Sequence, residues 1–558
     1  MTAGAIAAEV IRHGLGSATE QMRLALRRMA FSPVIHEAND FAAGLLDRHA
    51  RLLAQARSMP AFLGTLGMAT EAIVAACGGE DTLAPGDVLV STYAYDTGSH
   101  PPDMTFVVPG FVDGQLAGYA AVKAHVTDLG AKDTACTDTT DNFQEGLILP
   151  GVRLFAAGER RADVHRIMLA NSRAPEALAG DLAAIVAAAR MGIDQLCRIV
   201  TRHGSAGFTA ATEVMFDHGE KVVRDVFAGI PDGRYTGHAQ LDDNGITDEP
   251  IPLGITVEVS GSDVTVDLTG APAAASGPIN CPRAMTVSVA RVAVMSLVGG
   301  GESVNEGFFR PLHVRTTPGT IFHAVSPAPV FLYAWAAVAV ADGLHRALAT
   351  GLRERIPGRS GGDICATVFI GRDPETGRFW MDGTDHGVGQ GASAHGDQGA
   401  PLIHILTSGL LTACPEAMEA RGGLRVESYG LAPDSGGAGR HRGGLGVDVV
   451  YRTLTGCTLS MLWEQTRTPG WGLHGGGDAR VNAYRVVRPD GSVHESGKLG
   501  GYPLPAGSVV EVRTGGGGGW GPPQERDPAA VHADVREGYV SEAAARRDYP
   551  HAFEGGNR

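Results

Sequence analysis

Two short stretches of the chain hold side chains whose types and spacing could bind a divalent metal ion. The first, residues 95–103, contains His100 and Asp103 separated by two prolines, and the second begins at His125. Neutral imidazole nitrogen and carboxylate oxygen together suit zinc, manganese or iron(II). The prolines limit the backbone freedom lost when such a site becomes ordered. The plainer interpretation is that these are ordinary histidines, since the chain has 20 of them.

The segments around these residues predict a β-hairpin that joins the two stretches. Residues 88–90 and 104–108 are short apolar runs typical of strands. Residues 111–116 place an Asp-Gly pair between apolar positions, which is a strong hairpin signal. We therefore expect the returning strand to fold His125 back beside His100.

An acidic segment earlier in the chain offers a further ligand. Residues 34–41 open like a strand and then place Glu37, Asn39 and Asp40 at its expected edge. One of the two acids could complete a metal site. The alternative is that they are solvated loop residues.

The wider pattern predicts a multi-domain α+β protein with mixed sheets, covering helices and a strand-rich, glycine-rich C-terminal third. The length of 558 residues exceeds the ~250–300 residues of a single growing core. Residues 5–30 have helical periodicity, and Gly14 and Gly16 are expected to divide them into two helices. Alternation over 255–268 predicts a hairpin. We expect four regions: an N-terminal metal-site α+β region (1–230), a hairpin plus helical middle region (231–360), a β-rich C-terminal region (361–525) and a C-terminal tail (526–558).

Composition excludes several classes of protein. A net charge of −15 argues against a nucleic-acid binder, because such proteins neutralise phosphate with Lys and Arg. The seven cysteines are scattered and form no C-x-x-C pair, which indicates a reducing compartment. The N-terminus lacks a secretion signal, and the longest apolar run, 330–341, is shorter than the ~20 residues that span a bilayer. We expect a cytoplasmic protein without membrane contact.

The chain lacks the sequence motifs of nucleotide binding. It has no G-x-x-x-x-G-K-[ST] phosphate loop, no G-x-G-x-x-G opening a helix and no G-x-S-x-G elbow. The 78 glycines indicate many tight turns. Residues 515–519 are five successive glycines whose N–H groups could approach a phosphate, but plain packing is the favoured interpretation. We therefore expect no ATP site in this chain.

Ordered blocks along nearly the whole chain resemble the hydantoinase B/oxoprolinase family, which includes the C-terminal half of eukaryotic 5-oxoprolinase and the alpha-type subunits of acetone carboxylase. The matching blocks are Ser32-Pro33 with Glu37 and Asp40, Pro85-Gly86-Asp87-Val88, Gly98-x-His100-x-x-Asp103, His125-x-x-Asp128-x-Gly130, Gln144-Glu145-Gly146, Asn171-x-Arg173, Gly180-Asp181, Asn305-Glu306-Gly307, Asp434 to Gly439, Arg442 to Gly446 and Gly515 to Gly519.

The resemblance implies a B-type subunit of an ATP-dependent cyclic amidohydrolase that opens hydantoin, lactam or 5-oxoproline-like rings. A hydantoinase A-type partner would bind ATP and Mg and phosphorylate the carbonyl oxygen of the substrate, in a hetero-oligomer such as a heterotetramer. By motif position the metal ligands would be His100, Asp103 and His125, with Asp40 as the fourth. The residues before His100 and after His125 depart from the family pattern, which indicates a changed substrate pocket.

The implied mechanism is attack of water on the phosphorylated carbonyl carbon, assisted by zinc, manganese or iron. Asp128 or Asp96 would orient His125 or the attacking water. Two other functions share the same residues: a subunit of an ATP-dependent ketone carboxylase, and a non-catalytic assembly subunit with a structural metal.

Overall fold

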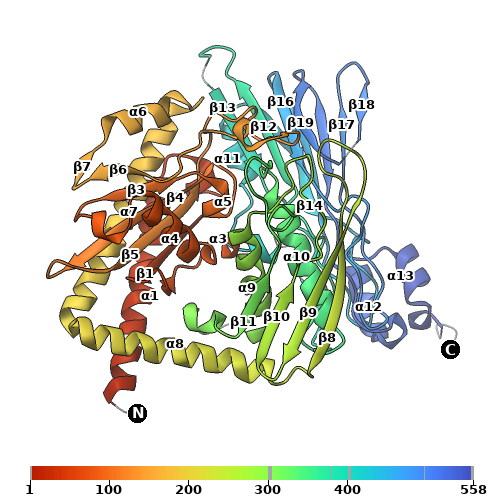
Figure 1. Ribbon diagram of the computed structural model, residues 1–558. Helices are drawn as coiled ribbons and strands as arrows, with labels where there is room; N and C mark the ends of the chain where they lie inside the picture. Colours follow the sequence, from red (N-terminus) through yellow and green to blue (C-terminus); the bar gives the residue numbers. More distant parts are fainter. Residues whose placement is uncertain (1–2, 300–303, 378, 400–403, 496, 555–558) are drawn as a thin grey trace. The chain divides into compact units, whose positions relative to one another are not determined.

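The computed structural model describes residues 3–299, 304–377, 379–399, 404–495 and 497–554 (Figure 1). Its internal contacts divide the chain into two compact units. Unit 1 comprises residues 1–134, 139–237 and 254–344, and unit 2 comprises residues 135–138, 238–253 and 345–558. This division is coarser than the four predicted regions, which stay a prediction.

Unit 1 is built on a seven-stranded sheet with the strand order β2-β1-β5-β4-β3-β6-β7. Every pairing in it is antiparallel. The strands are β1 Phe41–Asp47, β2 Leu52–Gln55, β3 Val88–Ser91, β4 Asp103–Val112, β5 Gln115–His125, β6 Val152–Ala156 and β7 Glu159–Arg160. The helices that begin in unit 1 are α1 Ala3–Met29, α2 Pro33–His36, α3 Pro60–Leu63, α4 Leu66–Ala76, α5 Ala94–Thr97, α6 Ala162–Ala170, α7 Pro175–His203, α8 Ser205–Phe227, α9 Arg283–Val298 and α10 Tyr333–Leu348.

The two faces of the central strands have different neighbours. Met104 and Phe106 of β4, together with Val122 and Ala124 of β5, belong to the large apolar core that includes α1 and α7. Successive side chains of a strand point to opposite faces. The odd-numbered residues Asp103 and His125 therefore lie on the face turned away from α1 and α7.

The expected division of residues 5–30 into two helices was wrong, because α1 is one continuous helix. Glycine inside a helix costs only about 1 kcal/mol relative to alanine, and α1 packs along α7. A Cβ atom on Gly14 would lie 3.3 Å from Ile199 of α7. Gly14 thus permits close helix packing and does not end the helix.

The strand expected to open at residue 34 was also wrong. Pro33 occupies the first turn of the short helix α2, with Ser32 as its N-cap residue, and β1 begins only at Phe41. Proline suits the start of a helix because its fixed φ is already helical and its missing N–H is not needed there. The buried carboxylate of Asp181 accepts the N–H groups of Phe31 and Ser32 and fixes the entry to α2.

The predicted hairpin is confirmed as β4 and β5, joined by Asp113 and Gly114. Both turn residues have positive φ, 51° and 74°, as a type I′ turn requires. The pairing shifts by one residue next to the turn: Phe111 pairs with Leu116 but Gly110 pairs with Gly118, so that Ala117 is an extra residue in β5. This β-bulge sets the register of the rest of the hairpin.

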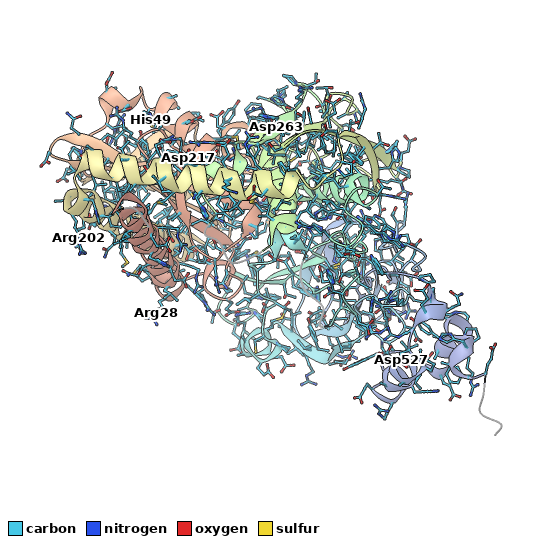
Figure 2. All side chains as sticks on the ribbon, turned by 90° about the horizontal axis from the view of Figure 1, so that it is seen from below. Arg28, His49, Arg202, Asp217, Asp263 and Asp527 are labelled. Atoms are coloured by element: carbon cyan, nitrogen blue, oxygen red, sulfur yellow. The ribbon has the colours of Figure 1, made fainter. Side chains whose placement is uncertain are left out.

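A second sheet, of order β11-β10-β9-β8, contains the hairpin predicted at 255–268, and that prediction is confirmed. Its strands are β8 Gly233–Leu241, β9 Ile251–Ser260, β10 Asp263–Asp267 and β11 Leu312–Arg315. The long helix α8 is tied to neighbouring segments by ion pairs, among them Arg310 with Asp217 and Arg224 with Asp263. Asp217 and Asp263 are labelled in Figure 2, which shows α8 along its length.

Unit 2 holds two antiparallel sheets, of order β13-β12-β16-β19 and β14-β15-β20-β17-β18. The strands are β12 Ala366–Arg372, β13 Phe379–Thr384, β14 Leu424–Leu431, β15 Val447–Thr453, β16 Cys457–Leu462, β17 Ala483–Val487, β18 Val493–His494, β19 Leu499–Leu504 and β20 Val509–Arg513. The remaining helices are α11 Pro415–Ala420, α12 Pro528–Arg536 and α13 Glu542–Asp548. Antiparallel sheets, together with the one sheet of the described residues that also has a parallel pair (β10 with β11), occur with helices and confirm the α+β class.

Residues 515–519 lie buried among other glycine-rich segments of unit 2. The N–H of Gly517 donates to Gly444, and its carbonyl accepts from Gly437, while the N–H of Gly518 donates to Arg359. A Cβ atom on Gly516 would lie 1.8 Å from the carbonyl oxygen of Ser435. These glycines allow backbones to pack directly against one another, which agrees with the packing interpretation. Tight turns alone therefore do not explain the glycine content.

None of the helices in the described part of the chain combines the length and the apolar character needed to cross a membrane.

Candidate metal centre

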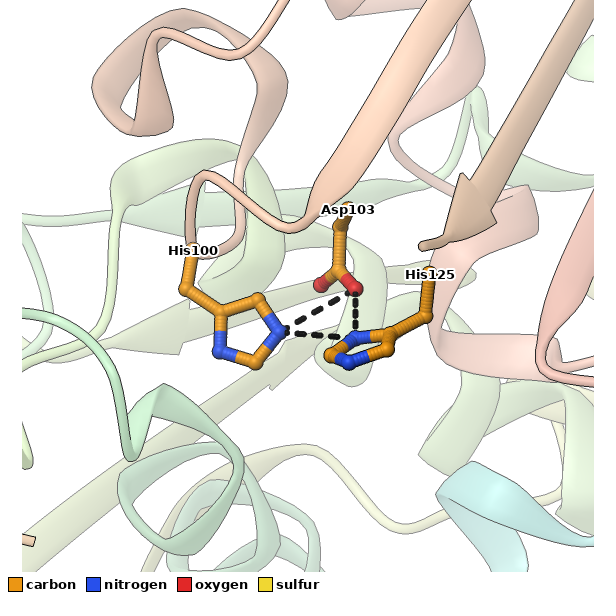
Figure 3. A group of neighbouring side chains, drawn as sticks. All are labelled: His100, Asp103 and His125. Carbon is orange, nitrogen blue, oxygen red and sulfur yellow. Dashed lines mark hydrogen bonds and ion pairs between the residues drawn. The ribbon is translucent and has the colours of Figure 1, made fainter. Parts of the chain in front are cut away.

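Three side chains of unit 1 bring their ligand atoms together at one end of the large sheet (Figure 3). Nε2 of His100 lies 3.1 Å from Oδ1 of Asp103 and 3.1 Å from Nδ1 of His125, and this Nδ1 lies 2.8 Å from the same carboxylate oxygen. Asp103 and His100 are buried, and the side chain of His125 keeps 20% of its surface exposed. The three atoms form a nearly equilateral triangle.

The hairpin register explains why these residues meet. Asp103 at the start of β4 pairs directly with His125 at the end of β5. Without the bulge at Ala117, Asp103 would pair with Ala124, and His125 would point to the opposite face of the sheet. His100 lies in the turn before β4, where its carbonyl accepts the N–H of Asp103.

Tyr333 fixes the second oxygen of Asp103. Its hydroxyl, at the start of α10, donates to Oδ2 at 2.9 Å, while Oδ1 faces the two histidines. The Tyr333 ring also packs edge-on against His100, with ring centroids 5.2 Å apart. Burial, followed by the Asp103 charge, raises the pKa of Tyr333 well above its usual value, so that the hydroxyl keeps its proton and remains a donor.

Phe331 orients His100. Its carbonyl oxygen lies 2.8 Å from Nδ1 of His100. A carbonyl only accepts hydrogen bonds, so Nδ1 carries a proton, and Nε2 offers a lone pair to the centre whenever the ring is neutral. The Phe331 ring packs on the imidazole at 4.6 Å. Metal-ligating histidines usually have such a partner for their other nitrogen.

His100 and Asp103 each shift the pKa of the other. Burial lowers the pKa of His100, but the Asp103 charge and hydrogen bonds outweigh it, and the net pKa is raised. Burial raises the pKa of Asp103, whereas the charge of His100 and hydrogen bonds from both histidines hold it well below its usual range. The carboxylate thus stays ionised. It stabilises a positive charge beside it, which can be a proton on an imidazole or a metal cation.

The donor set fits a divalent cation. Ligand atoms about 2.1 Å from a metal and at right angles to each other lie about 3.0 Å apart, which is the spacing of one face of an octahedron. The observed separations of 2.8, 3.1 and 3.1 Å match this spacing. Two imidazoles and one carboxylate on a single face are a ligand set known for first-row transition metals, and they leave further coordination positions open.

Lys123 is a buried cation on the same face of the sheet as His125, two residues earlier in β5. Its ammonium group donates to the carbonyl oxygen of Thr97 at 2.6 Å and lies over the ring of Phe62. Thr97 ends α5, three residues before His100. Burial lowers the pKa of Lys123 to about 7, against the opposing effect of the Asp103 charge.

The other predicted site residues lie outside this triangle. Asp40 is not part of the group of closely spaced ligand atoms, although its carbonyl accepts the N–H of His125, and its charge contributes to the raised pKa of Tyr333. Asp128 binds Arg173 at 2.9 Å and holds the loop after His125. Asp96 lies half-buried in α5, and burial raises its pKa. The ligand role of Asp40 and the orienting roles of Asp128 and Asp96 stay predictions.

Sequence reasoning missed three residues that support the centre: Lys123, Phe331 and Tyr333. The position of Lys123 could have been predicted, because residues two apart in a strand lie on the same face, which places Lys123 beside His125. Phe331 and Tyr333 had none, since they lie more than 200 residues from the hairpin, and only the tertiary fold brings them to it.

The fold and the site define an α+β protein with a two-histidine, one-carboxylate centre at the end of an antiparallel sheet. The family model of hydantoinase B/oxoprolinase matches residues 4–523. The chain therefore belongs to the hydantoinase B/oxoprolinase family, as the sequence blocks predicted.

Individual relatives match over nearly the full length of the chain. It is 29% identical to the B subunit of a putative D-/L-hydantoinase from Pseudomonas sp. (strain NS671), and the match covers 98% of this chain and 94% of the relative. The crystal structure of the ATP-dependent caprolactamase from Pseudomonas jessenii superposes with a TM-score of 0.92 at 28% identity and covers 99% of this chain and 97% of that one. A nucleotide-free structure of acetone carboxylase gives a TM-score of 0.87 at 18% identity, covering 98% and 79%, which shows a shared fold.

Proposed function

We propose that this chain is the B-type component of an ATP-dependent cyclic amidohydrolase that opens a hydantoin, lactam or 5-oxoproline-like ring. Family membership over residues 4–523 supports the assignment, and so do relatives named as the B subunit of a hydantoinase and the beta subunit of a caprolactamase. The observation that carries the metal-assisted mechanism is the triangle of His100, Asp103 and His125, which offers three ligand atoms at metal-binding spacing.

The proposal divides the chemistry between two chains. A hydantoinase A-type partner chain binds ATP and Mg and phosphorylates the carbonyl oxygen, because an amide carbonyl is a poor electrophile and a phosphorylated one has a good leaving group. Water then adds to the carbonyl carbon, the ring C–N bond breaks and the nitrogen takes up the proton of the added hydroxyl, which leaves an acyl phosphate. A second water cleaves the acyl phosphate, releasing the carboxylate and inorganic phosphate. The lack of a phosphate-loop motif in this chain is consistent with an ATP site on the partner.

The residues of this chain would hold zinc, manganese or iron and position it. His100, Asp103 and His125 supply the ligand atoms, with Asp40 as the proposed fourth ligand. A cation bound there would supply Lewis acidity, which lowers the pKa of coordinated water toward about 7. Tyr333 and Phe331 keep the carboxylate and one imidazole turned toward the centre. Asp128, held by Arg173, fixes the loop after His125 and is proposed with Asp96 to orient the water.

The test is His125→Ala in the complex with the A-type partner, with His49→Ala as the matched control. His49 is an exposed histidine of the same unit, labelled in Figure 2. We expect His125→Ala to lose metal and ATP-dependent ring opening while still assembling with the partner, and His49→Ala to keep both. The substrates are a panel of lactams and hydantoins.

Three results would contradict the proposal. Ring opening retained by the metal-free His125→Ala complex would remove the site from the reaction. Incorporation of labelled bicarbonate into a ketone, with no ring opened, would assign the chain to the ketone carboxylases. A metal bound without any turnover by the wild-type complex would indicate an assembly role with a structural metal.

A further inference from the structure

One segment, residues 328–333, reaches the metal centre from outside the hairpin. Phe331 contributes its carbonyl and its ring to His100, and Tyr333 contributes its hydroxyl to Asp103. This single stretch of chain therefore sets the orientation of two of the three ligand side chains. Only the start of α10 in this stretch is helical, and residues 328–332 are held by hydrogen bonds to other segments, from side chains and, at Leu332, from its N–H to the backbone carbonyl of Pro278 at 2.8 Å.

The principal anchor of the segment is Glu145, which is fully buried. Its Oε1 accepts the N–H groups of Val330 and Phe331, both at 2.8 Å, and the Val330 N–H is shared with Oε2 at 3.0 Å. Thr139 donates its hydroxyl to Oε1 at 2.8 Å, and Asn142 donates its amide to Oε2 at 2.9 Å. Two side chains thus fix the carboxylate, and the carboxylate in turn binds two successive peptide N–H groups.

Further contacts hold the same segment from its N-terminal side. The amide of Asn280 donates to the carbonyl of Pro329 at 2.9 Å, and the hydroxyl of Tyr95 donates to the carbonyl of Ala328 at 2.7 Å. These neighbours keep the segment in place, but Glu145 binds the residue whose carbonyl meets His100.

We propose that Glu145 is a positioning residue of the metal centre: it holds residues 330–333 so that Phe331 and Tyr333 keep His100 and Asp103 turned toward the cation. This inference rests on the proposed function. Glu145 is not one of the three clustered ligand residues, and it acts through the backbone of Phe331.

The role depends on the reach of the side chain and not on its charge. Glu145→Gln keeps an oxygen at the position that accepts the two N–H groups. Its new NH₂ group would face Asn142, whose Oδ1 is buried without a hydrogen-bond partner and can accept after the Asn142 amide rotates by half a turn. Glu145→Asp keeps the charge but withdraws the carboxylate by one methylene, about 1.5 Å. Comparing Glu145→Gln with Glu145→Asp therefore separates the effect of side-chain length from the effect of side-chain charge.

The experiment measures two properties of the purified chain. The first is hydrogen exchange of the backbone amides of residues 328–334 in metal-free protein. The second is the visible spectrum and chelator-competition affinity of bound Co²⁺. Asp181→Asn is the matched control, because Asp181 is an equally buried carboxylate of the same unit that accepts two backbone N–H groups elsewhere.

We expect Glu145→Asp and Glu145→Ala to exchange these amides at least tenfold faster, to bind Co²⁺ at least tenfold more weakly and to shift its absorption bands. Glu145→Gln should restore all three values, and Asp181→Asn should leave them unchanged. If Glu145→Ala does not fold, the results for Glu145→Asp still test the proposal.

The proposal is overturned if Glu145→Asp folds and shows wild-type exchange, affinity and spectrum, or if Glu145→Gln is as defective as Glu145→Asp. A wild-type chain that takes up no Co²⁺ would instead count against the proposed function. The exchange measurement on metal-free protein would then still decide whether Glu145 holds the segment.

Discussion

Replacing Tyr333 with phenylalanine would remove one oxygen atom beside the candidate metal centre and change nothing else in the side chain's shape. In the described structure the Tyr333 hydroxyl donates to Oδ2 of Asp103 at 2.9 Å. Asp103 is fully buried, so solvent does not reach this oxygen to replace the lost donor. The variant leaves an ionised carboxylate with one oxygen uncompensated.

The magnitude follows from the kind of bond that is lost. A hydrogen bond to a charged group contributes about 1.5–3 kcal/mol, and about 1.4 kcal/mol corresponds to a factor of ten in affinity. We therefore expect Tyr333→Phe to bind the cation about ten- to hundredfold more weakly. The same range is typical of residues that orient metal ligands without touching the metal.

The assay is competition for Zn²⁺ or Mn²⁺ with a chromophoric chelator at constant pH. Tyr451→Phe is the control, because Tyr451 is a buried tyrosine of unit 2 whose hydroxyl lies 2.8 Å from Nε2 of His386. We expect Tyr451→Phe to lose stability while the metal affinity stays within a factor of two or so of wild type. Equal affinities for Tyr333→Phe and wild type, in a chain that folds normally, would refute the assigned geometry of Asp103.

Two further predictions concern stability. The folded-state pKa of Lys123 is about 7, below its value of 10.5 in the unfolded chain, so the unfolded state binds more protons between these values and the free energy of unfolding rises with pH. Lys123→Met should therefore reduce the rise in the free energy of unfolding between pH 7 and pH 9 by up to about 2.7 kcal/mol. The measurement is urea unfolding of metal-free protein at both pH values. An unchanged rise would show that Lys123 does not titrate in this range. Gly516→Ala should destabilise unit 2 by more than about 3 kcal/mol, because its Cβ would lie 1.8 Å from the carbonyl oxygen of Ser435. Gly16→Ala in α1, where a Cβ meets nothing within 4 Å, should instead raise the free energy of unfolding by up to about 1 kcal/mol. Thermal unfolding compares the two alanine variants, and the opposite order of stabilities would contradict the packing argument.

Local sequence patterns predicted the elements whose signals are themselves local. The Asp-Gly pair at residues 113–114 specified a two-residue turn, because few other residues adopt positive φ at both positions. Alternation specified the hairpin of β9 and β10. The continuous helix α1 was missed because packing on α7 compensates the cost of Gly14 inside a helix. The short helix α2 was missed because Asp181 fixes its start, although the residues after Pro33 have a strand-like pattern.

The candidate site shows the same distinction. The types and spacing of His100 and Asp103 follow from the sequence, and the predicted hairpin brings His125 to them. The register does not follow from it, because one extra residue, Ala117, decides whether Asp103 faces His125 or Ala124. The spacing also could not tell that Asp40 lies outside the group of closely spaced ligand atoms.

The sequence by itself determined the types of the candidate ligand residues, the turn that joins their strands and the membership of the family. The tertiary structure alone decided which atoms converge, since the partners of His100 and Asp103 on residues 331 and 333 come from more than 200 residues away. The physical reason is range: turn geometry and strand alternation act between neighbours in the chain, whereas burial and hydrogen bonding act between neighbours in space.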